Sequence, residues 1–335
     1  MTGEQASRDA LWRMTNAYQV SQAIHVAASL GIADHLRDGP KSVEELAAAT
    51  GSHGPSLYRL MRALASVGIF VEADRRFDLT PLAEYLRSDM PGSVRAWATM
   101  VGRPYAWSTW SSLGSSIATG EAAFPALHGM SAWEYRAAHP EESAIFDTAM
   151  NSLATTAAGA VVGGYDFSGV GVLADIGGGQ GELLAGILAS NPTMRGILFD
   201  QPHVVAGAAS TLERAGVADR CEVIGGSFFE GVPRGADAYL LKSVIHDWDD
   251  PPAVEILRQC GTAIGDIGKL LLVEYLVRPG NEPDPLKFRD LMMLVMVGGR
   301  ERTAEDFGRL YAEAGFRLTE VIPTAPYHVI VGVPA

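Results

Sequence analysis

Residues 172–182 read Val172-Leu-Ala-Asp-Ile-Gly-Gly-Gly-Gln-Gly-Glu182, and this stretch indicates the architecture of the second half of the chain. An apolar run ends in the acid Asp175, four glycines follow, and apolar residues then recur at helical spacing from Leu183 to Leu188. This order predicts a strand, a tight loop and a helix. Glycines let the backbone approach a ligand closely, and the free N–H groups of a helix N-terminus bind polar ligand atoms. We therefore expect a nucleotide-like cofactor at this loop.

The glycine spacing discriminates between cofactors. The dinucleotide fingerprint needs glycine at its first, third and sixth positions. Counted from Gly177, the third position is Gly179 but the sixth is Glu182, so an NAD-dependent oxidoreductase is disfavoured. No Gly-Lys-Ser/Thr follows, which disfavours a Walker loop. An acid followed by glycines at 177, 179 and 181 resembles the S-adenosylmethionine loop of class I methyltransferases. That cofactor carries no phosphate, so its loop needs no basic residue. A glycine-rich turn without a ligand is the alternative, and four glycines within five residues disfavour it.

A second acid lies at the end of the predicted strand Gly196–Asp200. In doubly wound sheets an acid about 20 residues past the glycine loop hydrogen-bonds the ribose hydroxyls of the cofactor. Asp200 fits this position. NAD-binding proteins share this acid, so it does not separate the two cofactors. Its alternative role is to cap a helix that begins near Pro202.

Composition limits the function classes. The chain has 335 residues, enough for two domains, with 47% hydrophobic and 19% charged residues. A net charge of −13 argues against a nucleic-acid-binding surface, because such affinity comes mostly from neutralising phosphates. Two cysteines exclude a disulfide framework. The polar N-terminus and the lack of a long apolar run predict no signal peptide and no membrane span, hence a cytoplasmic protein.

Residues 9 to about 165 read as successive helices. Leu11–Leu36 carries apolar residues at helical spacing, Ser42–Glu45 forms a capping box, and Pro55 opens another helix. Residues 69–79 predict a small hairpin that turns at Asp74 and Arg75.

This succession resembles a winged helix-turn-helix, which suggests DNA binding as one function. From Ser42 to Thr80, however, four arginines and no lysine stand against five acids, whereas a groove-reading helix needs a basic excess. A packing or dimerisation module is the favoured interpretation. We expect a mostly helical domain over 1–165.

From residue 166 onward, strand and helix patterns alternate. This predicts a mostly parallel sheet with helices on both faces, that is, an α/β, Rossmann-like domain over 166–335. Ligands of such sheets lie at the carboxyl ends of the strands. The predicted strands are 171–176, 196–200, 221–225, 236–242, 269–275, 316–321 and 327–333.

The segment 238–250 holds the candidate catalytic base. Its predicted strand ends near Lys242, and His246 follows beside Asp247 and Trp248. Histidine is the usual general base near neutral pH, and its position at the rim of a cofactor-binding sheet favours that role over a structural one. The neighbouring acids also suggest a Mg²⁺ or Mn²⁺ site. Because Asp249-Asp250 before two prolines is typical of a helix N-cap, we expect no metal.

The whole chain resembles the plant-type and bacterial small-molecule O-methyltransferases, the group of caffeate, hydroxyindole and antibiotic-tailoring enzymes. The matching pieces occur in the family's order over the second half, while the helical first half fits only in kind. They are Asp175–Gly181, Phe199–Val204, Gly226–Phe229, Leu241–Trp248, Val273-Glu274 and Gly298–Thr303.

The resemblance implies a site. His246 would be the general base on the acceptor hydroxyl, and Glu274 and Glu301 would flank and orient it. The family usually has aspartate where Ser227 stands, so the adenine contact carries no charge here. The cofactor S-adenosylmethionine would be held by Asp175, Gly177, Asp200, Gly226, Ser227, Phe228 and Lys242.

The acceptor pocket is implied to lie between two helices that carry Phe146 and Met150, and Met292 and Met296. Aromatic and thioether side chains fit flat ligands, although their helical spacing is also that of plain core. We expect a phenolic or hydroxylated aromatic acceptor, with Arg13 or Arg103 as a candidate partner for a carboxylate on it. The family implies a homodimer, whereas the net charge and the apolar pattern predict no nucleic-acid and no membrane partner.

Two alternatives remain open. Some members of the family hydroxylate or decarboxylate their substrates, but the presence of His246, Glu274 and Glu301 favours methyl transfer. A ligand-sensing regulator built on the winged-helix-like part is the alternative from another class.

Overall fold

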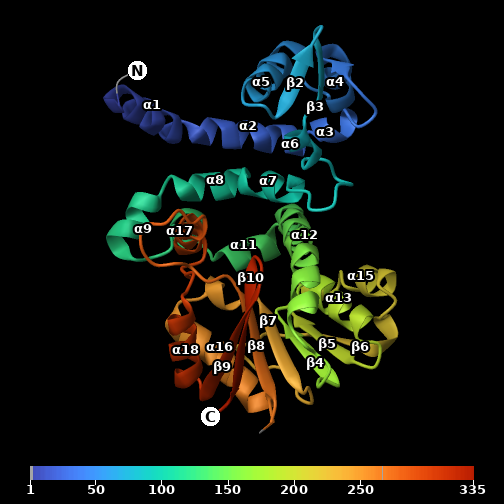
Figure 1. Ribbon diagram of the computed structural model, residues 1–335, viewed down its shortest axis with the longest axis vertical. Coiled ribbons are helices and arrows are strands. Elements are labelled where there is room, and N and C mark those ends of the chain that lie inside the picture. Colours follow the sequence, from blue (N-terminus) through green and yellow to red (C-terminus); the bar gives the residue numbers. More distant parts are fainter. Residues whose placement is uncertain (1–2, 266) are drawn as a thin grey trace. The chain divides into compact units, whose positions relative to one another are not determined.

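The computed structural model describes residues 3–265 and 267–335, and the chain forms two compact units (Figure 1). One unit ends at Ser108 and the other runs from Thr109 to Ala335. Residues 109–165, which the sequence assigned to the N-terminal domain, therefore belong to the second unit. The physical reason lies in α12 (Pro140–Gly164), whose Ala157 and Val161 are buried in the core of the sheet.

The first unit is mostly helical, as predicted. The Ser42 hydroxyl accepts the Glu45 N–H at 3.2 Å and the Glu45 carboxylate accepts the Ser42 N–H at 2.6 Å, which confirms the capping box. The helical stretch predicted over 11–36 is interrupted, once at Asn16 and once at Gly31, whose φ of +66° ends the helical path. The elements are α1 (Gly3–Thr15), α2 (Ala17–Ser29), α3 (Ile32–His35), β1 (Lys41–Ser42), α4 (Val43–Thr50), α5 (Gly54–Ser66), β2 (Phe70–Ala73), β3 (Arg76–Leu79), α6 (Pro81–Glu84) and α7 (Arg95–Val101), followed by α8 (Pro104–Trp110) at the boundary.

The second unit alternates strands and helices. No helix in the described ranges has both the length and the apolarity needed to cross a membrane. After α12 the elements are β4 (Val172–Ile176), α13 (Glu182–Ser190), β5 (Arg195–Asp200), α14 (Pro202–Val205), α15 (Ala209–Arg214), the 3₁₀ turn η1 (Ala218–Arg220), β6 (Cys221–Gly225), β7 (Ala238–Lys242), the 3₁₀ turn η2 (Ile245–Asp247), α16 (Asp250–Ala263), β8 (Lys269–Glu274), α17 (Leu286–Met296), α18 (Ala304–Glu313), β9 (Phe316–Thr324) and β10 (Tyr327–Pro334). Before α12 come α9 (Leu113–Thr119), α10 (Ala123–His128) and α11 (Ala132–Ala138).

The strands form one sheet in the order β6-β5-β4-β7-β8-β10-β9. The pairs from β6 through β8 are parallel, and β10 runs antiparallel to both of its neighbours. The predicted mostly parallel sheet is therefore confirmed. The strand order reverses between β4 and β7, and ligands of open α/β sheets bind at such a switch point. The loops that follow β4 and β7 are the glycine loop and the His246 turn.

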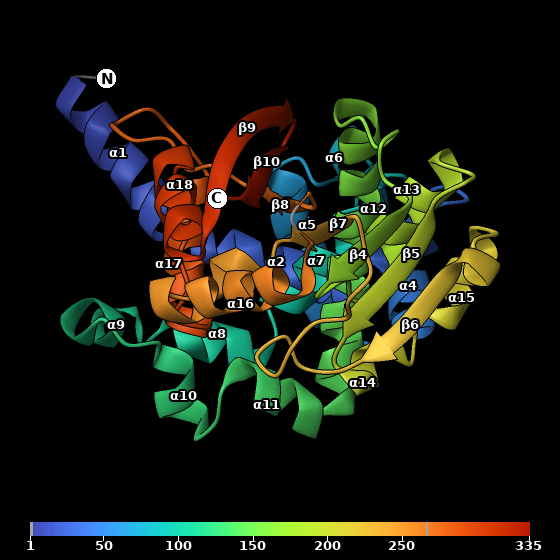
Figure 2. The ribbon, with the colours of Figure 1, turned by 90° about the horizontal axis from the view of Figure 1, so that it is seen from below.

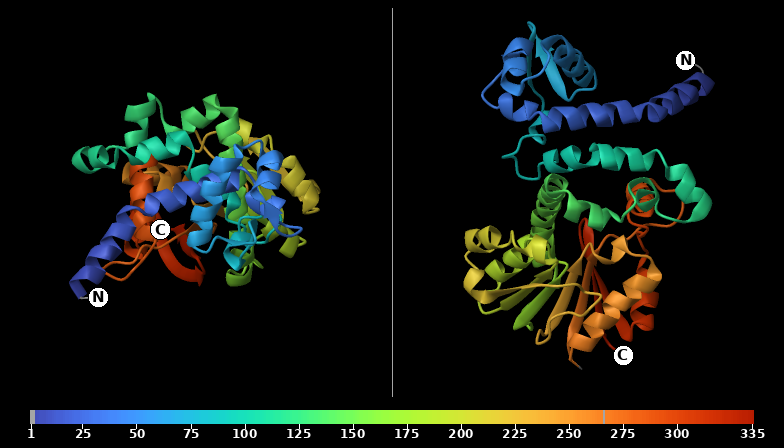
Figure 3. Two further views of the ribbon diagram at one scale, coloured as in Figure 1. Left: turned by 90° about the horizontal axis from the view of Figure 1, so that it is seen from above. Right: turned by 180° about the vertical axis from the view of Figure 1, so that it is seen from behind.

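Both faces of the central strands β4, β5, β7 and β8 are buried, which explains their continuous apolar runs. One face packs against α12 and α13, through side chains such as Leu173, Leu184 and Leu188. The other packs against α16 and α18, through side chains such as Leu257 and Phe307. Figure 2 shows these two helical layers on either side of the strands. Helix α17 lies over the carboxyl ends of the parallel strands, beside α9 and α10 (Figures 1 and 3).

Candidate active site

The glycine loop follows β4 and turns sharply over the sheet. Gly177, Gly179 and Gly181 have φ values of +70°, +62° and +82°, which favour glycine over any other residue. A side chain on Gly177 would also approach the Val244 side chain to 2.7 Å. The loop thus presents bare backbone next to the His246 turn. Gly181 is the N-cap of α13, so the free N–H groups of the first turn of this helix face the loop.

Asp200, at the end of β5, anchors this loop. Its Oδ2 accepts the Gly179 N–H at 2.8 Å and its Oδ1 accepts the Gln201 N–H at 2.6 Å. Burial raises the pKa of Asp200, and these two N–H groups lower it in part. The alternative of a helix cap is wrong, because Gln201 is the N-cap of α14 and no side chain caps this helix; the Asp200 carboxylate binds the glycine loop and the Gln201 N–H instead.

Asp175 is buried beneath the loop. Neither of its carboxylate oxygens has a hydrogen-bond partner among the described residues, and only 1% of its surface is exposed. Burial and the nearby Asp200 raise the pKa of Asp175 to about 7, although Lys242 lowers it in part. A buried acid without a partner is costly, so this group is suited to receive a polar ligand or to stay protonated.

Gly226, Ser227 and Phe228 follow β6 and lie on the same rim. The Gly226 N–H donates to the Asp200 carbonyl at 2.9 Å, and the Ser227 hydroxyl accepts the Phe229 N–H at 3.3 Å, so the serine caps a local turn. The Phe228 ring packs over Gly177 and edge-on to Trp248, with ring centroids 6.0 Å apart. The structure therefore brings Gly177, Phe228 and Trp248 together as an aromatic wall beside the bare backbone.

His246 lies on the short turn η2, with 4% of its surface exposed. Its Nδ1 lies 3.1 Å from Oε2 of Glu274 and 3.6 Å from Oε1 of Glu301. Its Nε2 lies 3.4 Å from Oδ1 of Asp247. The three predicted catalytic residues, which are 55 positions apart at most in the sequence, thus meet in space.

Glu274 binds the turn as well as the ring. Its Oε1 accepts the N–H groups of Val244 and Ile245 at 3.1 and 2.9 Å. Burial would raise the pKa of Glu274, but the imidazole of His246 and the guanidinium of Arg289 lower it below its usual value. The carboxylate is therefore ionised at neutral pH and fixes both the backbone and the imidazole of the turn.

Glu301 is held from the other side by α17. Its carboxylate pairs with Nε of Arg289 at 2.7 Å, and its N–H donates to Asp290 at 2.8 Å. Burial raises the pKa of Glu301, while His246 and Arg289 lower it in part. The Arg289 guanidinium also lies 4.4 Å from the ring centroid of Tyr275. Sequence reasoning missed Arg289; the only signal was a charged residue beside Asp290, directly before the apolar second half of the helix, Leu291–Met296.

The charges of the site determine the protonation state of His246. Burial lowers the pKa of His246, but the carboxylates of Glu274 and Asp247 raise it more, to about 10. The pKa of Lys242 shifts in the opposite direction, because burial and the nearby Arg289 lower it to about 8. The Lys242 ammonium lies 5.3 Å from the ring centroid of Tyr327. The imidazole of the free protein thus holds its proton up to an alkaline pH.

The four predicted acceptor-binding residues lie on two helices. Phe146 on α12 is half-buried and packs edge-on to Trp133. The centroid of its ring lies 3.7 Å from Cζ of Arg136. Met150 follows one turn later on α12. On α17, Met292 and Met296 come three and seven residues after Arg289, so they share the helix face that points toward Glu301.

Arg13 and Arg103 belong to the other compact unit, so their predicted contact with an acceptor stays a prediction. The predicted helix cap at Asp249 is confirmed, because this side chain accepts the Asp250 N–H at the start of α16.

The geometry of the site agrees with the family comparisons. A model of the O-methyltransferase domain matches residues 110–317, and a model of the O-methyltransferase dimerisation domain matches residues 12–89. The chain belongs to the O-methyltransferase family. The predicted family, enzyme class and Rossmann-like fold with a helical dimerisation domain are thereby confirmed.

Individual relatives of this O-methyltransferase carry the comparison further. The phenazine O-methyltransferase PhzM of Lysobacter antibioticus is 47% identical over 94% of this chain and 92% of its own. The crystal structure of LaPhzM superposes with a TM-score of 0.94 at 45% identity, over 98% of this chain and 99% of that one. The O-methyltransferase NcsB1 from neocarzinostatin biosynthesis, solved with S-adenosylmethionine and 2-hydroxy-5-methyl naphthoic acid, has a TM-score of 0.83 at 34% identity, over 94% and 96% of the two chains.

Proposed function

We propose that this O-methyltransferase transfers the methyl group of S-adenosylmethionine to a hydroxyl of a phenolic or hydroxylated aromatic small molecule in antibiotic-type secondary metabolism, with His246 as the general base. The observation that carries the proposal is the imidazole of His246, which two buried carboxylates hold at Nδ1 on the rim of the sheet. The antibiotic context rests on the phenazine and neocarzinostatin relatives.

The residues of the rim fit the methyl donor. The glycine loop offers backbone without side chains, Asp175 has unpartnered buried oxygens, and Phe228 supplies an aromatic wall. When bound, S-adenosylmethionine supplies a methyl group already activated by a positive sulfur. Asp200 would meet the ribose and Ser227 the adenine. Lys242 would close the far side of the pocket.

The general base activates the acceptor hydroxyl, whose oxygen is the nucleophile. A phenol with a pKa of about 10 is ionised only about one part in a thousand at pH 7. A neutral imidazole within hydrogen-bond reach removes the proton as the oxygen attacks, which typically contributes about 10²–10⁴-fold in rate. Glu274 and Glu301 both lie at Nδ1, so Nε2 is the nitrogen that would accept the proton. Phe146, Met150, Met292 and Met296 would hold the flat acceptor, and close alignment of both reactants supplies the rest of the acceleration.

The pH profile should report the carboxylates around His246. Because only the neutral imidazole accepts a proton and its pKa is raised to about 10, kcat/KM should rise with pH well beyond the ordinary histidine range. Asp247→Asn removes one charge that raises this pKa. The rising limb of the kcat/KM–pH profile should therefore lie at lower pH in this variant than in the wild type. The measurement is kcat/KM from pH 6 to about 10.5. Two acceptors of different phenol pKa serve as the control, since a limb that belongs to the enzyme does not move with the acceptor. An Asp247→Asn profile identical to the wild type would contradict the assignment.

The proposed homodimer rests on the first unit. The dimerisation-domain model covers residues 12–89, and Leu11, Met14 and Tyr18 are exposed by 66%, 73% and 55% in the single chain. We expect the double variant Leu11→Asp, Met14→Asp to elute as a monomer in size-exclusion chromatography with light scattering, because charges do not pack in an apolar interface. Exposed Glu4→Ala on the same helix is the control. A double variant that stays dimeric would place the interface elsewhere.

A direct assay tests the function. The purified chain is incubated with S-adenosylmethionine and a panel of phenolic acids, naphthols and hydroxyphenazines, and the products are read by mass spectrometry. Methylation adds one CH₂ to the acceptor, hydroxylation adds one oxygen, and decarboxylation removes CO₂. Binding of random duplex DNA at low salt, with no turnover of any acceptor, would favour the ligand-sensing regulator instead.

A further inference from the structure

The backbone of residues 299–302 runs against the turn that carries His246. The Arg300 N–H donates to the His246 carbonyl at 2.9 Å, and the Val277 N–H donates to the Arg302 carbonyl at 3.1 Å. A side chain on Gly299 would collide with the His246 carbonyl, so only glycine permits this approach. The segment is thus fixed both to the turn and to the residues just after β8.

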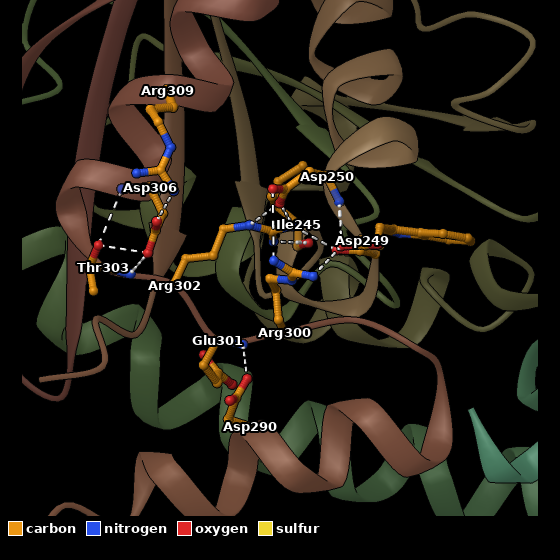
Figure 4. A network of polar contacts seen from close by, with 11 residues as sticks. Ile245, Asp249, Asp250, Asp290, Arg300, Glu301, Arg302, Thr303, Asp306 and Arg309 are labelled. Atoms are coloured by element: carbon orange, nitrogen blue, oxygen red, sulfur yellow. Dashed lines mark hydrogen bonds and ion pairs between the residues drawn. The ribbon is translucent and has the colours of Figure 1, made fainter. Parts of the chain in front are cut away.

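The side chain of Arg302 then folds back onto the same turn. It is 1% exposed, and its guanidinium donates to the Ile245 carbonyl at 3.0 Å and to the Trp248 carbonyl at 2.8 Å. It also pairs with Oδ1 of Asp250 at 2.7 and 3.1 Å (Figure 4). The two carbonyls lie on either side of His246 in the chain, so one planar cation ties both ends of the turn.

We propose that Arg302 is a positioning residue for methyl transfer: its guanidinium fixes the backbone on both sides of His246 and so aims the imidazole at the acceptor hydroxyl. The proposal rests on the role of His246 as base proposed above. Two consecutive residues then position His246 together: Glu301 orients the imidazole ring, and Arg302 holds the backbone on either side of it.

The chemistry of arginine is what this task requires. A guanidinium presents donors in a rigid plane that reaches several acceptors at once, whereas a lysine ammonium is a point charge on a flexible stem. A purely structural role, as the partner of Asp250 at the start of α16, would need only the carboxylate contact. Two further donors of Arg302 bind the turn itself, outside α16.

The conservative variant Arg302→Lys in the full chain tests the proposal. We expect kcat on the alkaline plateau of the pH profile, counted per site that binds S-adenosylhomocysteine in calorimetry, to fall by about 10–100-fold, because a misplacement near 1 Å costs about 10²-fold. The affinity for S-adenosylhomocysteine and the acceptor KM should stay unchanged. Arg309→Lys is the matched control, since Arg309 pairs with Asp306 on α18, is exposed, and does not touch the turn.

The pH profile distinguishes positioning from mere structure. The groups around His246 are Glu274 from β8, Asp247 from its own turn and Glu301, with Lys242 from β7 and Arg289 from α17 behind them. A loosened turn weakens the contacts to Glu274 and Asp247 that raise the pKa of His246. The limb of kcat/KM in Arg302→Lys should therefore lie at lower pH than in the wild type, and that of Arg309→Lys should not move.

Several outcomes overturn the proposal. One is that Arg302→Lys has the wild-type kcat per binding site and the wild-type pH profile. Another is that its loss of activity is fully explained by a smaller number of sites that bind S-adenosylhomocysteine. If Arg302→Lys does not fold, Asp250→Asn decides, because it removes the charge of the carboxylate at the start of α16 but leaves both carbonyl contacts in place. A wild-type kcat per binding site with an unmoved limb supports the proposal. A fall in kcat with a shifted limb would mean that the pair with Asp250, rather than the carbonyl contacts, holds the turn, and overturns it. His246→Gln is assayed in parallel: if it retains full activity, the proposed base has failed, whatever Arg302 does.

Discussion

His246→Gln is expected to lower kcat by about 10²–10⁴-fold, the usual contribution of a positioned general base. Glutamine is close to histidine in size and keeps a polar group in the buried site, but its amide does not act as a base at any pH of the assay. Binding of S-adenosylhomocysteine should be unchanged, because the imidazole is held by Glu274, Glu301 and Asp247 rather than by the glycine loop. The measurements are single-turnover methyl transfer and calorimetric titration.

The control for this variant is His53→Gln, which changes an exposed histidine at the start of α5. It should retain the wild-type rate. A further comparison uses an acceptor whose hydroxyl is already ionised at the assay pH. The loss in His246→Gln should then shrink, because no proton needs removal. A full rate in His246→Gln with ordinary phenols would exclude the base, and a loss of donor affinity would make His246 a cofactor contact instead.

Local patterns predicted the elements of this fold well. The capping box at Ser42, the hairpin turn at Asp74 and Arg75 and the cap at Asp249 were all read from a few neighbouring residues. The same holds for the strand–loop–helix at the glycine loop, because glycine spacing and apolar runs are local signals. The predicted strand ends lie within a few residues of those observed.

What the sequence did not predict depends on contacts between distant residues. The fold-back of Arg302 onto Ile245 bridges 57 positions, and the hydrogen bond from Gly179 to Asp200 bridges 21. Periodicity carries no information about such pairs. The same reason explains why residues 109–165 were grouped with the first helices: the helical pattern of α12 does not say which apolar surface covers it.

The sequence identified the site residues largely through family resemblance, and the structure adds the charges between them. The resemblance supplied His246, Glu274 and Glu301 but not Arg289, which pairs with Glu301. Without this cation two carboxylates would face one imidazole nitrogen, which is unfavourable in a buried site. The balance of charges, and hence the protonation of the base, is therefore a property of the folded site rather than of any motif.

Glu274→Gln should show how that balance supports both stability and activity. Glutamine can still accept the N–H groups of Val244 and Ile245, but the buried negative charge beside His246 is lost. Removing one partner of a buried ion pair costs about 3–5 kcal/mol, so the thermal midpoint should fall clearly below the wild type. Exposed Glu305→Gln on α18 is the matched control and should leave the midpoint unchanged.

The pH dependence of Glu274→Gln separates the charge effect from simple loss of packing. In the wild type the pKa of His246 is raised from 6.5 to about 10, so its contribution to stability is full below pH 6.5 and is lost as the pH rises through 10. The pKa of Glu274 is lowered, so its contribution is present above its unfolded value of 4.5 and is lost as the pH falls through the lower folded value. The variant loses both contributions, and the difference in unfolding free energy from the wild type should therefore be largest between about pH 4.5 and 6.5, where both are fully present, and shrink toward either extreme. Its kcat/KM limb should also lie at lower pH, because a principal charge that raises the pKa of His246 is gone. A stability difference that is constant from pH 4 to 10 would mean that Glu274 acts through packing alone, and the ion pair would then not set the proton on the base.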